Sequence, residues 1–158
     1  MRAGRLRLLF VTDTTTFDGP ERQVLHQVRR LDPKVRHARV LSMREPGELA
    51  VKLQHAEAQV FSGDVPPGAE AERMIHRFAG AYRLTKLLRS MEPDVAHAFD
   101  LEADVRMRKP CRMAGVPVII GAYREHRGPD DVWVVRAKKS SGLVDAVVAP
   151  TAELADEA

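Results

Sequence analysis

Cysteine is almost absent from this 158-residue sequence, which contains one, Cys111. A single thiol excludes an internal disulfide framework and any zinc site built on several cysteines. Aromatic residues are also scarce, at 5% of the chain. Because single-stranded nucleic acids are usually bound by aromatic side chains set among clustered cations, this composition argues against a nucleic-acid partner.

Long apolar runs are missing as well. No stretch approaches the roughly 20 apolar residues that cross a bilayer, and the apolar block at 8–11 is shorter than the ~7–15 residues of a signal-peptide core. We therefore expect a cytoplasmic protein, with the inner face of the membrane as the alternative location. The net charge is only +3, and the cations are scattered. A small anionic molecule, a phosphate group or an acidic membrane surface fits this charge distribution.

Apolar residues make up 44% of the chain and charged residues 30%, which is a normal globular balance. Short apolar runs alternate with segments in which apolar residues recur every three or four positions, and this alternation predicts β-α-β units. We expect one domain over 1–158, a Rossmann-like three-layer α/β/α sandwich with a mostly parallel sheet of about six strands. The predicted strands are 6–11, 38–41, 58–61, 95–98, 116–121 and 144–149, and the predicted helices are 19–32, 46–53, 69–91, 101–114, 132–141 and one starting at 151.

Polar residues follow three of the predicted strands, at the ends where open α/β sheets bind ligands. After the first strand, Asp18, Gly19, Pro20 and Glu21 lead into a helix, whose free N–H groups and dipole suit an anion. The loop matches neither G-x-G-x-x-G nor a P-loop, so it lacks the usual dinucleotide and triphosphate fingerprints. The alternative is a plain helix start, with Asp18 or Gly19 as the cap and Pro20 in the first turn.

The fourth predicted strand is followed by a second polar group, which includes His97, Phe99, Asp100 and Glu102. Strand alternation puts His97 and Phe99 on one side and Asp100 on the other. A histidine in this position can bind a hydroxyl or phosphate, or transfer a proton. The alternatives are a core histidine for His97 and a helix cap for Asp100.

The loop after the fifth predicted strand contains Tyr123, Arg124, Glu125 and His126. Arginine binds phosphate or carboxylate groups in a forked geometry, and the alternative is a solvated polar loop. The remaining histidines lack the spacing of metal ligands, and Cys111 has no evident histidine partner. We therefore expect no metal site and no cysteine nucleophile.

Four fragments stand out in order along the chain: LRLLFVTD with the helix start at Pro20-Glu21-Arg22, EPDVAHA at 92–98, AGVPVI at 114–119 and VDAVVAPT at 144–151. Together they resemble motifs of the family-four retaining glycosyltransferases. These enzymes have the two-lobed GT-B architecture, and the resemblance is to their N-terminal half. It implies that this chain is the acceptor-side lobe, and that the C-terminal donor-binding lobe lies outside the chain and is supplied in cis or in trans.

The resemblance also implies a reaction, in which a nucleotide-sugar co-substrate passes its sugar to a sugar, lipid or small-molecule acceptor with retained anomeric configuration. It implies no further cofactor. The loop at 18–21 would face the donor phosphates. This interpretation requires that Gly19, His97 and Arg124 lie together at one shared groove. We expect the isolated chain to be inactive, and to self-associate through its uncovered side. The acceptor side would be formed by His97, Phe99, Asp100, Glu102, Tyr123, Arg124, Glu125 and His126.

Two residues depart from the family pattern. Pro20 stands where the family has a second glycine and has no N–H to donate to a phosphate. Phe99 stands where the family has a histidine near the transfer site. These departures keep open a second hypothesis, a non-catalytic binding or interaction module derived from the same fold. The basic residues between Arg22 and Arg44 also allow peripheral contact with anionic lipid, with a solvated helix face as the alternative.

Overall fold

The computed structural model describes residues 6–14, 19–32, 38–44, 47–63 and 74–157. Strands and helices alternate along them, as the sequence predicts. The bounds differ from those predicted by up to three residues, and the predicted helix turn at 69–73 lies outside the described residues. The elements are β1 (Leu8–Thr12), α1 (Gly19–Arg30), β2 (Arg39–Ser42), α2 (Leu49–His55), β3 (Gln59–Ser62), α3 (Met74–Met91), β4 (Val95–Ala98), α4 (Leu101–Ala114), β5 (Val118–Ala122), α5 (Val132–Lys139), the 3-10 turn η3 (Ser141–Leu143), β6 (Ala146–Val148) and α6 (Ala152–Glu157).

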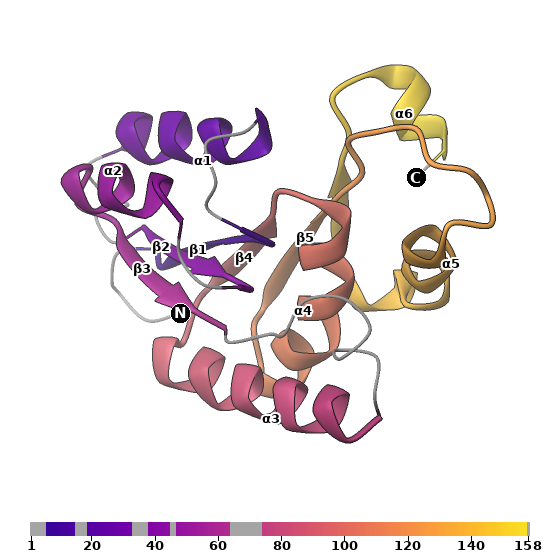
Figure 1. Ribbon diagram of the computed structural model, residues 1–158, viewed down its shortest axis with the longest axis horizontal. Coiled ribbons are helices and arrows are strands. Elements are labelled where there is room, and N and C mark those ends of the chain that lie inside the picture. The colour runs from indigo at the N-terminus through magenta and orange to yellow at the C-terminus, as the bar shows by residue number, and fades with distance from the viewer. Residues whose placement is uncertain (1–5, 15–18, 33–37, 45–46, 64–73, 158) are drawn as a thin grey trace.

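The six strands form one sheet in the order β3-β2-β1-β4-β5-β6, and every neighbouring pair is parallel. Helices α1 and α2 lie on one face of this sheet, and α3 and α4 lie on the other (Figure 1). The predicted Rossmann-like class is confirmed, and the sheet is wholly parallel. Strand order reverses between β1 and β4, the place where open sheets of this kind bind ligands.

Alternating residues of β1 pack into two apolar cores on opposite faces of the sheet. Leu9 and Val11 face the core built with α3 and α4, which includes Leu88 and Met107. Phe10 faces the core built with α1 and α2. β1 is therefore covered on both faces, as expected for a central strand of a parallel sheet.

The close approach of α4 to β5 depends on a glycine. A Cβ added at Gly121 would lie 2.6 Å from the Oδ2 of Asp104. Asp104 is fully buried and accepts bonds from the Nη2 and Nε of Arg108, at 2.6 and 2.9 Å. Arg108 also donates to the carbonyl of Ala137 at 2.7 Å and so joins α4 to the end of α5. The hydrogen bonds offset the cost of removing both charges from water.

None of the described helices is both long and apolar enough to cross a bilayer.

Candidate functional site

Three aromatic rings gather beside the reversal point of the sheet. Phe10 on β1 pairs in register with His97 on β4, and Phe99 follows β4 directly. The ring centroids of His97 and Phe99 lie 4.6 Å apart, and those of Phe10 and Phe99 lie 5.4 Å apart. The predicted placement of His97 and Phe99 on one side is therefore confirmed. Phe99 is completely buried, so its ring supports the site from beneath.

Arg124, just after β5, lies over this ring cluster. Its Cζ is 5.1 Å from the centroid of the Phe99 ring, and its Nη1 donates to the Oε1 of Gln23 at 2.6 Å. Gln23 lies one helical turn after Gly19, the first residue of α1. The first turns of α1, the end of β4 and the end of β5 therefore meet at one place. The predicted convergence of Gly19 itself with His97 and Arg124 stays a prediction.

His97 is a neutral imidazole at this place. Its Nε2 is buried and has no hydrogen-bond partner within the described part of the chain. Burial, together with the nearby positive charge of Arg124, lowers the pKa of His97 to about 4. Because the ring is uncharged near neutral pH, it can exchange hydrogen bonds with a hydroxyl group of a ligand but supplies no positive charge.

Asp100 has the structural role that the sequence left open, that of a helix cap. Its Oδ1 accepts from the N–H of Ala103 at 2.7 Å and so caps α4. Its Oδ2 accepts from the N–H of Asp13 at 2.7 Å and so holds the segment after β1. Glu102, in the first turn of α4, lies 3.8 Å from the Nη2 of Arg44. Both carboxylates therefore fix loops around the site.

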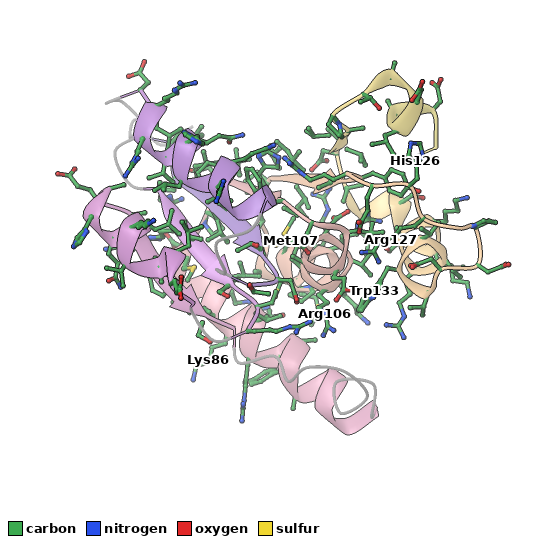
Figure 2. The ribbon with its side chains drawn as sticks, turned by 45° about the horizontal axis from the view of Figure 1, so that its top comes forward. Lys86, Arg106, Met107, His126, Arg127 and Trp133 are labelled. Carbon is green, nitrogen blue, oxygen red and sulfur yellow. The ribbon has the colours of Figure 1, made fainter. Side chains whose placement is uncertain are left out.

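The other predicted residues of the loop after β5 differ in burial. Tyr123 is 5% exposed and packs with Leu101, Val134 and Leu154. Glu125 is exposed and forms an ion pair with Arg127. His126 is exposed, and Figure 2 shows it apart from the labelled side chains of α4. Their predicted place on an acceptor side stays a prediction.

The predicted donor loop is described only in part. Asp18 lies outside the described residues. Gly19 begins α1, and Pro20 and Glu21 lie in its first turn, which agrees with the helix start given as the alternative. A Cβ added at Gly19 would meet nothing within 4 Å.

Sequence reasoning missed Gln23, Arg106 and Trp133. Gln23 carries a usable signal, since it stands four residues after Gly19 in a predicted helix. Arg106 on α4 and Trp133 on α5 lie side by side, with the guanidinium carbon 4.8 Å from the centroid of the indole ring. No local pattern marks that pair, because it depends on how two helices pack.

Two kinds of chemistry find little support. Burial raises the pKa of Cys111 to about 12, so this thiol is not ionised near neutral pH. Among the described residues, no group of three or more histidine, cysteine, aspartate or glutamate side chains is placed to hold a metal ion.

The predicted basic surface is only partly available for membrane contact. Arg39 donates to Gln59 and to the carbonyl of Met91, and Arg44 forms an ion pair with Asp13 at 2.7 Å. Lys34 and Arg36 lie outside the described residues. Peripheral membrane contact and self-association both stay predictions.

The fold of this chain is similar to part of several larger solved structures. No family model and no curated protein sequence matches the chain. Among solved structures, HepE from Anabaena in complex with UDP and glucose matches with a TM-score of 0.71 at 12% identity, over 96% of this chain and 40% of that one. The apo form of the lipopolysaccharide outer core galactosyltransferase WaaB matches with a TM-score of 0.68 at 13% identity, over 96% and 41%. The chain therefore has the fold of a single GT-B lobe and spans about two fifths of those structures.

Proposed function

We propose that this chain is the acceptor-side lobe of a nucleotide-sugar-dependent retaining glycosyltransferase. It would work with a donor-binding lobe supplied in cis or in trans. The observation that carries the proposal is the meeting of His97, Arg124 and the start of α1 beside the reversal point of the sheet. HepE has been solved with UDP-glucose, and WaaB is a galactosyltransferase, so UDP-hexoses are the first donors to test.

The geometry suits the charge changes of sugar transfer. The acceptor oxygen forms a bond to the anomeric carbon while the bond from that carbon to the diphosphate oxygen breaks. Negative charge then grows on the departing diphosphate. The N-terminus of α1 and the guanidinium of Arg124 would stabilise this charge, because both are held in place before the reaction begins. The neutral imidazole of His97 would bind a sugar hydroxyl.

We test this proposal with a chimera that joins residues 1–158 to the C-terminal lobe of WaaB. We expect sugar transfer from a UDP-hexose to one of a panel of sugar, lipid and small-molecule acceptors. In an active chimera, Arg124→Gln should lower kcat/KM by about a hundred- to a thousandfold, the range seen when one donor to a developing negative charge is lost. His97→Ala should also lower kcat/KM, because it removes a contact to a sugar hydroxyl. Arg83→Gln and His55→Ala are the matched controls, since both residues are exposed on helices away from the site.

The isolated chain should show no turnover with the same donors and acceptors, because half of the cleft would be missing. Turnover by residues 1–158 alone would contradict the proposal. So would an active chimera that is insensitive to the substitutions at positions 97 and 124.

One observation favours the alternative of a non-catalytic binding module. Phe99 is 0% exposed and packs between Phe10 and His97, and its ring cannot exchange protons. A folded chimera that binds donor and acceptor but transfers no sugar would favour this module over the enzyme.

A further inference from the structure

Arg106, on α4, differs from its neighbours in how its guanidinium group is bonded. Its Nε is buried, and no hydrogen bond or ion pair of this side chain is found within the described part of the chain. Arg108, two residues further along α4, has all three of its side-chain nitrogens bonded. A partly buried cation without hydrogen-bond partners lowers the stability of the folded state. Such a group therefore suggests a role other than stabilisation.

The indole ring of Trp133 holds Arg106 in place. The Cζ of Arg106 lies 4.8 Å from the centroid of this ring, and the Cζ of Arg136 lies 4.9 Å from it. Figure 2 shows Arg106 and Trp133 next to each other between α4 and α5. Asp131 caps α5 by accepting from the N–H of Trp133 at 2.8 Å, which fixes the turn that carries the ring.

A stacked guanidinium is prepared to bind an oxyanion. A guanidinium that contacts an aromatic ring through its face keeps its N–H groups, which lie in its own plane, for other partners. That edge matches two oxygen atoms of a phosphate or carboxylate, which it binds through two parallel hydrogen bonds. Little side-chain freedom remains to be lost when such an anion binds.

The charges around Arg106 are mixed. Among the charged groups, Asp13 and Glu102 act on Arg106 most strongly, and Arg44 and Arg136 act on it less strongly. Arg44 lies 2.7 Å from Asp13 and 3.8 Å from Glu102, and so partly offsets both carboxylates. Three cations, Arg106 included, therefore stand against two carboxylates.

The position of Arg106 relates it to the candidate site. It stands one helical turn after Glu102, near the end of α4 that Asp100 caps. Asp100 also binds the segment after β1. Arg106 therefore lies at the same carboxyl edge of the sheet as His97 and Arg124, on the side toward α5.

We propose that Arg106, stacked on Trp133 and flanked by Arg44 and Arg136, binds a phosphate ester group of the acceptor. This inference rests on the proposed function where it names the acceptor, and the anion site itself stands on the contacts above. The shared chemistry is that of a sugar phosphate and of a phospholipid headgroup, and the test separates the two.

The first measurement is phosphate binding by the 158-residue chain. Inorganic phosphate is titrated by calorimetry at an ionic strength held constant with sodium chloride. The fluorescence of Trp133, the only tryptophan, reports whether the anion reaches this ring. We expect Arg106→Gln to weaken phosphate binding at least about tenfold, as the loss of a charge-assisted bidentate contact implies. Arg106→Lys keeps the positive charge but cannot form two parallel hydrogen bonds, so its phosphate affinity should lie between those of the wild type and Arg106→Gln.

Lys109→Gln is the matched control, because Lys109 is an exposed cation on the same helix. It should change phosphate affinity less than about twofold, because loss of an exposed charge outside the site removes only weak, screened attraction. Circular dichroism checks that each variant is folded. Equal affinity of the wild type and Arg106→Gln would overturn the proposal, and so would a Trp133 signal that responds to chloride as strongly as to phosphate.

Two further arms identify the source of the phosphate group. Tighter binding of glucose 1-phosphate than of inorganic phosphate, lost in Arg106→Gln, identifies a soluble acceptor. Co-sedimentation with vesicles of phosphatidylcholine and phosphatidylglycerol, lost in Arg106→Gln and retained in Lys109→Gln, identifies a lipid headgroup. Phosphate binding at Arg106 without any transfer by the chimera would leave this site standing and contradict the proposed function. Sugar transfer by the chimera that is unchanged in Arg106→Gln would support the proposed function and contradict a role of Arg106 in binding the acceptor.

Discussion

At the scale of single residues, His97 shows how the fold sets the chemistry of one side chain. The same imidazole in the unfolded chain has a pKa near 6.5, and in the folded chain burial and the charge of Arg124 lower the pKa to about 4. Proximity to Arg124 therefore has two effects. It adds a cation for an anionic ligand, and it keeps the neighbouring ring neutral, so the two groups offer different interactions to a ligand.

The first prediction concerns the pH dependence of stability. Between pH 6.5 and 4 the unfolded chain takes up a proton at residue 97 and the folded chain does not. The free energy of unfolding therefore contains a contribution from His97 that is complete above pH 6.5 and is lost as the pH falls toward 4. We expect His97→Phe to lose less stability than the wild type between pH 7 and pH 5 in urea unfolding.

An NMR titration of the imidazole provides the direct check. The His97 resonances should stay those of the neutral ring at pH 5. A His97 midpoint near 6.5 would contradict the prediction.

At the scale of elements, α4 organises the site through its ends. Asp100 caps its first turn and binds the segment after β1. Gly115 ends the helix in the left-handed conformation, with φ at 81°, which glycine adopts without strain. The ion pair between Asp104 and Arg108 fixes the middle of the helix against β5 and α5. The geometry of the loops therefore depends on one rigid helix.

The second prediction separates the two bonds of Asp100. Asp100→Ala removes both and should lower the free energy of unfolding by about 1–3 kcal/mol, the sum of a lost cap and an unpaired N–H group. Asp100→Asn keeps one oxygen acceptor and should cost less. Asp131→Ala, which removes the cap of α5 and a 3.5 Å ion pair with Arg127 in the adjoining loop, is the comparison. Urea unfolding measures all three, and equal losses for Asp100→Ala and Asp100→Asn would contradict this division of roles.

The elements were largely predictable because their signals are local. β4 and α4 have the predicted bounds, since Pro93 and Gly115 delimit patterns of the right period. The side shared by His97 and Phe99 followed from strand alternation. The contact of Arg124 with Gln23 joins residues 101 positions apart, and only the order of the strands brings them together.

Burial was harder to predict than contact at the site. Tyr123 packs beside Leu154 of α6 in an apolar cluster, and nothing in the loop sequence indicates this burial. Its predicted place on the acceptor side stays a prediction. The stacking of Arg106 on Trp133 likewise depends on the packing of α4 against α5.

At the scale of the whole molecule, the burial of the strand residues decreases from the centre of the sheet toward β6. β1 is almost entirely buried, whereas all three residues of β6 are exposed. Val118 on β5 and Val148 on β6 are 37% and 40% exposed. The central strand beside the candidate site is therefore the most buried, and the edge strand β6 pairs only with β5.

The third prediction follows from this gradient. Local opening is easiest where few apolar contacts are lost, so backbone amides of β6 should exchange with solvent faster than those of β1 and β4. Hydrogen exchange followed by NMR under native conditions measures the order. β6 amides as slow as those of β1 would show that the edge is stabilised by something other than its own packing.

The glycine at the contact of α4 with β5 limits how related chains can diverge. Any side chain at position 121 would collide with the carboxylate of Asp104, and a smaller neutral residue at 104 would leave the charge of Arg108 unbalanced. No single replacement among these three positions is neutral by itself. Across homologues they should therefore be inherited as a set, and a change at one should coincide with compensating changes at the other two.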